Sequence, residues 1–515
     1  MKIDKIIISC ADALIDKYGA QGLAAIREAL DAMVAADAKR HFNTKVVFAD
    51  RHRDMSPYGH RIDGPATPKT MKAAVDAIYA ADKPDYIMLL GAWDVVPVQS
   101  LDNPLFDPND EDPDDRYVES DLPYACDAPF SRDINDFIGP TRVVGRLPDL
   151  MGATDPAYLL RIMRIAIHAR TRKASEYETC FALSAQRWQA STALSLRTIY
   201  QHSSKLLTCP DEGPDWSVRK LAPRVHFINC HGGKGESTYY GEATKHKVNA
   251  PLPPAHQAAW LKKKIIDGAV MAAECCYGAQ LYDPQDTENQ AGIAYTYLNE
   301  GAYGVFGSST VAYGPYSGND SADLITQMFL GNVLHGASLG RAALEAWQVF
   351  AGKWSHLNPE HQKTIAQFYL LGDPSIHAVK MTERSFNKTR VFHDAFKKTH
   401  DAGPRKLRRE KLLRSGRSIE REMPRTVRNR ELRASGSVDE ILRRSARESG
   451  MGNYAQRHYD VEPKRVAPLL ERVRRTVHVF MKVRRRTKGQ PPDVTLITAT
   501  AENGKLIHIR RSHSR

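Results

Sequence analysis

The sequence of 515 residues has few cysteines and no long hydrophobic segment. Its seven cysteines are odd in number and all precede residue 277, which argues against a disulfide framework. No apolar run approaches the ~18 residues that a membrane-spanning helix needs. The isoleucines at residues 6–8 are too few for the core of a signal peptide. We therefore expect a protein of the reducing cytoplasm that does not interact with membranes.

Positive charge is concentrated in one part of the chain. The formal net charge is +13, but residues 381–515 carry 35 Lys and Arg against 15 Asp and Glu, whereas residues 1–380 carry 38 against 45. The overall charge therefore does not make the whole protein a nucleic-acid-binding protein. The basic region, which includes Arg484-Arg485-Arg486, has few aromatic residues to stack bases. It is either a site for nucleic acid or a regulatory partner, or a solvated charged surface.

Short apolar runs alternate with amphipathic stretches up to residue 380, which is typical of βαβ units. We predict an α/β fold with a mostly parallel sheet flanked by helices. The predicted strands are residues 6–9, 45–49, 86–90, 141–144, 180–183, 225–229, 269–273 and 303–306. The predicted helices are residues 22–35, 68–81, 155–168, 190–206, 255–266, 322–334 and 339–350.

The length predicts more than one folded unit. Residues 102–137, rich in Asp and Pro, interrupt the alternation and predict a long surface loop. Near the end of the sequence, residues 476–483 and 494–500 read as strands, and Asn503-Gly504 predicts a hairpin turn into a strand at 505–509. The predicted units are an N-terminal α/β subdomain (1–170), a second α/β subdomain (171–380), a basic charged linker or helical segment (381–450) and a small basic module containing β-strands (451–515).

Two of the predicted strands end at residues that can carry nucleophilic chemistry. The strand at 225–229 is followed by His231, and the strand at 269–273 is followed by Cys275 and Cys276. Reactive groups in open α/β sheets collect beyond the carboxyl ends of strands, so adjacent strands would place the imidazole beside a thiol. A thiol attacks as thiolate, and a neighbouring imidazole lowers its pKa and later protonates the leaving amine. The pattern therefore indicates acyl transfer.

Other interpretations of these residues are less favourable. Taken singly, such cysteines and histidines are usually buried structural residues, but their joint position favours catalysis. A zinc site would use Cys230, His231, Cys275 and Cys276, yet adjacent ligands without a Cys-x-x-Cys spacing fit zinc poorly. Residues 336–340 match the Gly-x-Ser-x-Gly nucleophile elbow, but the preceding residues are helical, so we interpret them as a helix start.

The region around the cysteines resembles the catalytic region of the gingipains, which are cysteine endopeptidases of the caspase-like fold. The resemblance extends through residues 301–309, includes His231 and Gly232, and continues more loosely at residues 120–124, 144–148 and 371–375. It implies a caspase-like fold and hydrolysis of peptide bonds in protein or peptide substrates, without metal or cofactor. The segment with the most specific resemblance reads Glu274-Cys275-Cys276-Tyr277-Gly278-Ala279-Gln280-Leu281-Tyr282-Asp283-Pro284-Gln285.

The resemblance also implies roles for individual residues. Cys276 is the preferred nucleophile because Gly278 follows it at the spacing found in caspases. Cys275 stays the alternative, because other caspase-like peptidases have a Cys-x-x-Gly spacing. His231 takes the role of general base and acid, and Asp121 the role of the carboxylate that orients the imidazole.

The remaining expectations concern substrate binding. The backbone N–H groups of Gly232 and Cys276 are expected to hold the oxyanion. In the family an acidic residue can select a basic P1 side chain, and the candidates for such a pocket here are Ser308, Ser309, Tyr313 and Asp320. A rival function is a catalytically silent caspase-like scaffold whose basic tail binds nucleic acid or an acidic partner.

Overall fold

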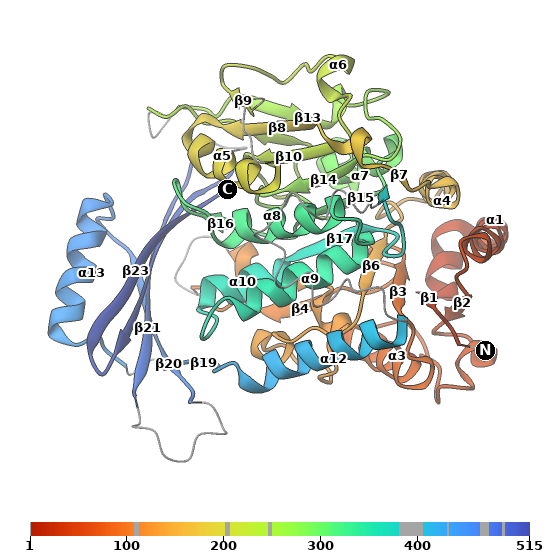
Figure 1. Ribbon diagram of the computed structural model, residues 1–515, viewed down its shortest axis with the longest axis horizontal. Helices are drawn as coiled ribbons and strands as arrows, with labels where there is room; N and C mark the ends of the chain where they lie inside the picture. The colour runs from red at the N-terminus through yellow and green to blue at the C-terminus, as the bar shows by residue number, and fades with distance from the viewer. Residues whose placement is uncertain are drawn as a thin grey trace.

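The computed structural model describes residues 2–107, 113–200, 206–245, 250–380, 405–429, 432–463, 473–486 and 490–515. A central sheet runs through the first 380 residues, and within the described ranges it has ten strands in the order β2-β1-β3-β6-β17-β15-β14-β10-β8-β9 (Figure 1). These strands are β1 Lys5–Ser9, β2 Thr44–Phe48, β3 Tyr86–Leu90, β6 Val144–Leu147, β8 Cys180–Ala185, β9 Leu206–Cys209, β10 Val225–Asn229, β14 Val270–Ala273, β15 Gly304–Ser308 and β17 Phe368–Gly372.

Neighbouring strands of this sheet are parallel except at one junction. β15 and β17 pair antiparallel, so two parallel halves of opposite direction meet there. The sheet is continuous across residue 170, because β6 pairs with β17 from the other side of that position. This arrangement confirms the α/β class with a mostly parallel sheet. The domain boundaries stay predictions.

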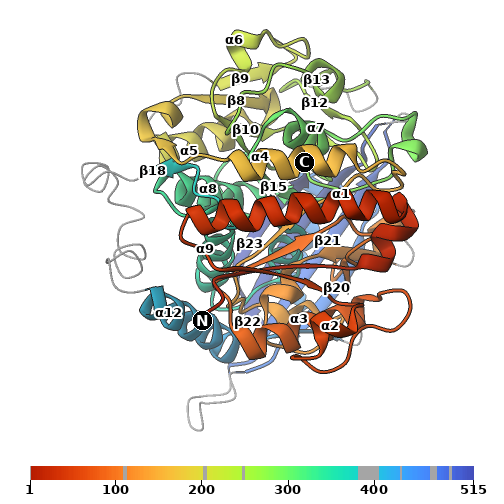
Figure 2. The same cartoon turned by 90° about the vertical axis from the view of Figure 1, so that its right-hand side faces the viewer.

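Helices cover both faces of the sheet (Figure 2). On one face α1 (Ala11–Lys39) contacts α4 (Ala157–His168), which contacts α7 (Ile293–Glu300). On the other face α8 (Ser321–Leu334) lies between α5 (Gln189–Tyr200) and α9 (Leu339–Gly352).

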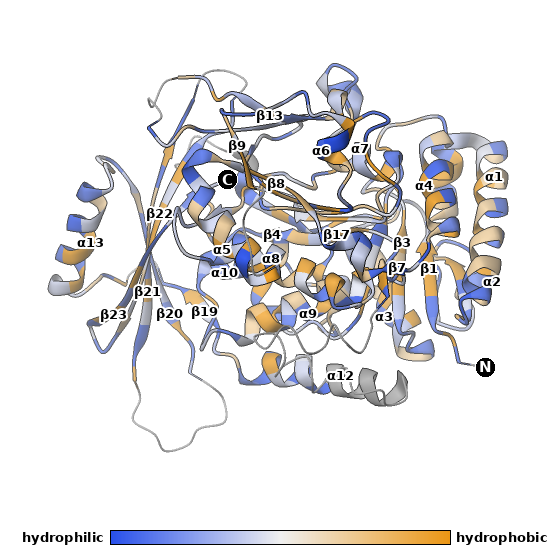
Figure 3. Ribbon diagram, turned by 45° about the horizontal axis from the view of Figure 1, so that its top comes forward, coloured by the Kyte–Doolittle hydropathy of each residue, from blue (hydrophilic) through white to orange (hydrophobic). Residues whose placement is uncertain are grey.

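The strands of the central sheet are buried on both sides. Ile6, Ile7 and Ile8 of β1 have no exposed surface, and Figure 3 shows the hydrophobic colour gathered in strands such as β1 and β3. A continuous apolar run is what a strand covered by helices on both faces requires. The remaining α-helices in the described ranges are α2 His52–Met55, α3 Pro68–Asp82, α6 Val218–Leu221, α10 Pro359–Gln367, α12 Arg405–Glu422 and α13 Gly436–Glu448.

A second, antiparallel sheet forms the C-terminal region. Its described strands lie in the order β16-β23-β22-β21-β20-β19, and α13 packs its buried Leu442 against this sheet. Asn503 and Gly504 both have positive φ, as a two-residue hairpin turn requires, and they join β22 to β23. The predicted hairpin is therefore confirmed. The strands are β16 Tyr313–Gly314, β19 Thr426–Arg428, β20 Ala455–Val461, β21 Arg475–Arg484, β22 Asp493–Glu502 and β23 Lys505–Ser514.

Several predicted elements are wrong or displaced. The helix expected at 255–266 is absent, because β13 (Pro254–Gln257) pairs with β12 (Thr238–Tyr240) and only a short 3-10 turn follows. The strand expected at 141–144 begins at Val144. The long segment 102–137 contains β5 (Tyr117–Ser120), which forms a hairpin with β4 (Gln99–Asp102); its residues 108–112 lie outside the described residues. Of the helix predicted at 190–206, residues 201–205 lie outside the described residues, and Leu206 begins the strand β9.

Candidate active site

The two strand ends carrying His231 and Cys276 are neighbours in the sheet. β10 and β14 pair in parallel, with Ile228 opposite Ala273. His231 and Cys276 each lie three residues beyond this pair in the sequence. Both side chains lie just past the carboxyl ends of their strands, where α/β folds place reactive groups.

Gly232 allows the segment that follows β10 to approach the segment that follows β14 closely. A Cβ atom at this position would lie 1.9 Å from the carbonyl oxygen of Cys276, so no other residue fits without displacing the backbone. The N–H groups of Gly232 and Cys276 both donate to the main-chain oxygen of Arg515, at 3.4 and 3.2 Å. The two amides expected to hold an oxyanion therefore converge on a single oxygen atom.

The adjacent thiols of Cys275 and Cys276 face different surroundings. The Cys276 sulfur accepts the Ala312 N–H at 3.2 Å and lies 3.4 Å from the Ala312 carbonyl oxygen. The Cys275 sulfur is directed at the carbonyl oxygen of Ile228 in β10, 3.9 Å away. Burial raises the pKa of Cys276 to about 12 and that of Cys275 well above its usual value. Cys276 is thus the thiol beside the Arg515 backbone, and it is protonated in this arrangement.

His231 is held from two sides. Its Nε2 atom lies 2.8 Å from Oε2 of Glu242, which follows β12, the hairpin partner of the short strand β11 (His231–Gly232). The Trp188 ring packs on the imidazole with a centroid separation of 4.4 Å. Among the described residues, the buried Nδ1 atom has no hydrogen-bond partner. No other group in the described part of the chain therefore uses the lone pair of this nitrogen.

Glu242 keeps its negative charge beside His231. It also pairs with Arg187 at 3.0 Å and Arg486 at 3.6 Å. Burial alone would raise the pKa of Glu242, but the contact with His231 and the two arginines outweighs burial and lowers it to about 2. Burial lowers the pKa of His231 despite the opposing effect of Glu242. The pair therefore consists of a carboxylate that orients a neutral imidazole.

Asp121 does not have the role expected for it. Its two carboxylate oxygens accept hydrogen bonds from Nη2 and Nε of Arg146 at 2.6 and 2.8 Å, and both side chains are buried. Arg146 also donates to backbone oxygens, including that of Val96 at 2.7 Å, so the ion pair holds the loop after β3. Glu242, to which no sequence pattern assigned this role, is instead the carboxylate that contacts His231.

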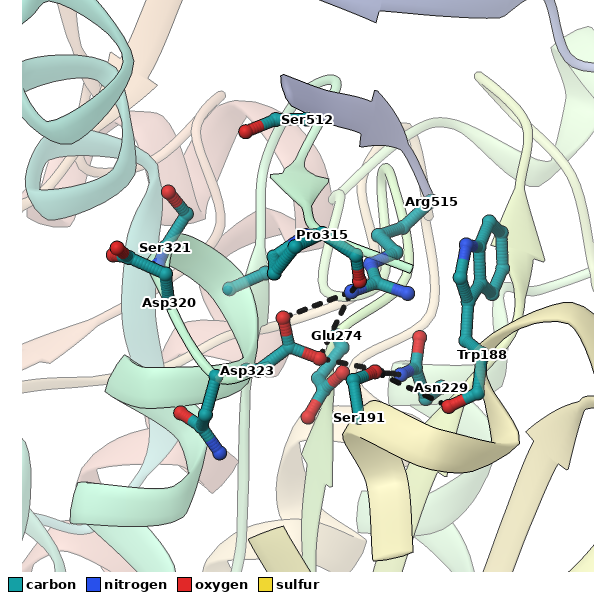
Figure 4. Close-up of polar contacts among 12 residues, drawn as sticks. Trp188, Ser191, Asn229, Glu274, Pro315, Asp320, Ser321, Asp323, Ser512 and Arg515 are labelled. Carbon is teal, nitrogen blue, oxygen red and sulfur yellow. Dashed lines mark hydrogen bonds and ion pairs between the residues drawn. The ribbon is translucent and has the colours of Figure 1, made fainter. Parts of the chain in front are cut away.

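A buried pocket beside the thiol holds the side chain of Arg515 (Figure 4). Its Nη2 atom donates to both carboxylate oxygens of Asp323, at 2.8 and 2.9 Å, and to the carbonyl oxygen of Pro315 at 2.8 Å. The guanidinium lies 4.6 Å from the centre of the Trp188 ring. Arg515 and Asp323 are both completely buried. The pocket thus supplies a carboxylate, a carbonyl and an aromatic face to one guanidinium.

A second carboxyl group lies in the same pocket. Glu274, which directly precedes the cysteine pair, is buried next to Asp323 and contacts the Thr326 hydroxyl at 3.3 Å. Burial and the charge of Asp323 raise the pKa of Glu274 well above its usual value. Glu274 therefore holds a proton more readily than an exposed glutamate, while Asp323 is the acid whose oxygens contact the guanidinium.

The residues predicted for the pocket have other roles. Asp320 caps α8 through the Ser321 N–H and pairs with His361 and Arg510, so Asp323, one turn along α8, is the acid that contacts Arg515. The contacts of Ser308 and Ser309 lead to backbone oxygens of Thr310 and Glu119, whereas Tyr313 lies in β16 opposite Ser514. Asp323 gave no sequence signal of its own, because it reads as a first-turn acid of an ordinary helix.

Two arginines of the predicted basic region form contacts within the protein. Arg486 contacts Glu242, and Arg484 donates to the Gly450 carbonyl oxygen. A nucleic-acid or regulatory partner for this region stays a prediction.

The described residues contain no cluster of three or more His, Cys, Asp or Glu side chains arranged to hold a metal ion. All seven cysteines are free. In the part of the chain that the structure describes, no helix combines the length and apolar character needed to cross a membrane.

Comparisons with known proteins indicate the class of protein. Residues 225–379 match the model of peptidase family C25, the gingipain family of cysteine peptidases. The match includes both strand ends and the pocket acid Asp323, and it supports cysteine peptidase activity. Together with the mostly parallel sheet, it agrees with the predicted caspase-like fold. No curated protein shows significant sequence similarity to this chain.

Solved structures show more distant likenesses. One described as "Structure of Protease" aligns with a TM-score of 0.45 and 14% identity, covering 99% of this chain and 96% of that chain. Two structures of the Saccharomyces cerevisiae separase–securin complex align with TM-scores of 0.30 and 0.28 and identities of 15% and 13%. These two alignments cover 45% and 46% of this chain and 14% of the other chain in each case.

Proposed function

We propose that the protein is a cysteine endopeptidase in which Cys276 is the nucleophile, His231 the general base and acid, and Glu242 the residue that positions the imidazole. The observation that carries this proposal is the convergence of the Gly232 and Cys276 N–H groups on one main-chain oxygen, that of Arg515. Donors placed in this way stabilise the negative charge of a tetrahedral intermediate.

The reaction follows from these positions. The Cys276 sulfur gives its proton to Nδ1 of His231 and attacks the carbonyl carbon of the scissile bond, and the two N–H groups hold the oxyanion. The C–N bond breaks, the leaving amine takes the proton from His231, and an acyl thioester remains on Cys276. Water, activated by His231, then hydrolyses the thioester and restores the thiol. Glu242 stays anionic throughout, which favours the imidazolium that forms transiently.

We further propose that the enzyme cleaves after arginine. The contacts of Arg515 with Asp323, Pro315 and Trp188 are those a P1 arginine would need. A lysine ammonium is a compact point charge that has no planar face to lay on Trp188, so we expect a preference for arginine over lysine at P1.

The test is hydrolysis of a fluorogenic peptide with arginine at P1. It is run on the full chain and on an Arg515→Ala variant, so that an occupied pocket is not mistaken for absent chemistry. We expect cleavage that is lost in Cys276→Ala and in His231→Ala but retained in Cys275→Ala, the matched control. Absence of turnover in both the wild type and Arg515→Ala, or full turnover in Cys276→Ala, overturns the proposal.

A further inference from the structure

The end of β23 lies in the candidate site as an extended strand. Ser514 pairs with Tyr313 and His513 with Gly314 in the antiparallel ladder between β23 and β16. The Arg515 N–H continues this ladder by donating to the Ala312 carbonyl oxygen at 3.0 Å. In Figure 1, β23 runs from the C-terminal sheet toward the central body and ends beside β16. Backbone pairing of this kind is a common way for a domain to bind an extended peptide.

The side chains of this strand alternate between two surroundings. Arg515 enters the Asp323 pocket, and His513 stacks on Tyr316 with a centroid separation of 3.7 Å and an interplanar angle of 13°. Ser514 turns the other way, where its hydroxyl accepts the Val494 N–H at 2.8 Å. Arg515 and His513 thus take the P1 and P3 positions against the central body, and the C-terminal sheet covers the residue between them.

The strand is also held before it reaches the thiol. The Ser512 hydroxyl donates to Glu360 at 2.9 Å, and Arg510 forms an ion pair with Asp320 at the start of α8. Residues 512–515 are all buried, with exposed fractions of 5% or less. Their backbone and side chains together fill the space that a bound peptide would need.

We propose that residues 513–515 are a tethered ligand of the peptidase site, bound in the P3 to P1 positions, and that they keep the enzyme inactive until the end of β23 leaves β16. This inference rests on the proposed function, because it concerns the regulation of the same site.

Two physical consequences follow from the tether. A segment held beside its site competes at an effective concentration in the millimolar range, so free substrate at micromolar concentration is largely excluded. The occupant also removes water from the thiol, and this burial accounts for the raised pKa of Cys276. Withdrawal of the strand would expose the thiol to water and to substrate in one step.

The experiment compares kcat/KM for a fluorogenic P1-arginine peptide among full-length variants. Arg515→Ala removes the P1 side chain from the pocket, and we expect kcat/KM to rise at least about 10-fold. Arg511→Ala is the matched control, because Arg511 lies on the same strand but is exposed, and we expect its activity to equal that of the wild type. A synthetic peptide of residues 505–515 is expected to inhibit Arg515→Ala competitively, and the same peptide ending in alanine to inhibit more weakly.

Because Arg515 is buried, its substitution could unfold the protein, so a second variant tests the inference independently. Arg510→Ala removes the ion pair with Asp320 without altering the Asp323 pocket, and we expect a smaller rise in kcat/KM, about 3-fold. Circular dichroism shows whether each variant is folded. Equal kcat/KM in the wild type, Arg515→Ala and Arg510→Ala overturns the inference. In that case measurable turnover leaves the proposed peptidase intact, whereas no turnover in any variant rejects the peptidase itself.

Discussion

Substitution of Asp323 by asparagine tests how the pocket selects arginine. Both carboxylate oxygens of Asp323 contact one guanidinium nitrogen, and neither side chain of the pair is exposed. Removing one partner of such a buried pair costs about 3–5 kcal/mol, and each 1.36 kcal/mol is a factor of ten in rate. Glu274 lies alongside and can ionise once Asp323 is gone, which favours the lower end of that range. We therefore expect kcat/KM for a P1-arginine peptide to fall about 10²-fold.

The assay pairs this peptide with one that carries citrulline, the uncharged isostere, at P1. Measurements are made in the Arg515→Ala background, because Asp323 also binds Arg515. For the citrulline peptide, kcat/KM should fall only slightly or rise. The ratio of kcat/KM between the arginine and citrulline peptides should therefore become much smaller. Asp320→Asn is the matched control, since Asp320 contacts His361 and Arg510, and it should affect both peptides alike. Equal losses on both peptides in Asp323→Asn, or no loss on either, would refute this explanation of specificity.

Two further predictions follow from residues around the site. Because the pKa of Glu242 falls from 4.5 to about 2 on folding, its charge stabilises the protein above the unfolded pKa by about 3 kcal/mol, and this is lost as the pH falls toward 2. The difference in unfolding free energy between the wild type and Glu242→Gln should therefore shrink from pH 6 to pH 2 in denaturant titrations; a difference that is constant or grows contradicts this. Tyr316→Ala should lower kcat/KM about 3- to 10-fold for peptides with histidine at P3 relative to glycine; an unchanged ratio shows that the ring does not bind P3.

The sequence predicted the features near the site that depend on local pattern. β10 and β14 were both expected as short apolar strands, and because they pair in parallel, their carboxyl ends, followed by His231 and Cys276, lie at one edge of the sheet. That the two side chains act together stays a proposal. The hairpin at Asn503-Gly504 was equally local, because those residues accept positive φ. The contacts of the Cys275 and Cys276 thiols distinguish the two residues, and no sequence pattern predicts those contacts.

Other parts of the site depend on tertiary contacts. Glu242 contacts His231 because the β11–β12 hairpin brings them together. Asp121, the carboxylate expected from the sequence, forms an ion pair with Arg146. The pairing of β12 with β13 overrides the helical spacing of residues 255–266. Arg515 reaches Asp323 through strand pairing across 192 residues. Such partners cannot be read from periodicity, because many acids lie at equivalent distances along the chain.

Whether Cys276 is the nucleophile can be measured by covalent labelling of Arg515→Ala with a peptidyl chloromethyl ketone that has arginine at P1, followed by mass spectrometry of the digested protein. We expect a single adduct on the sulfur of Cys276, blocked by an excess of P1-arginine peptide and absent in His231→Ala. An adduct on Cys275, or no adduct on folded protein, would contradict it.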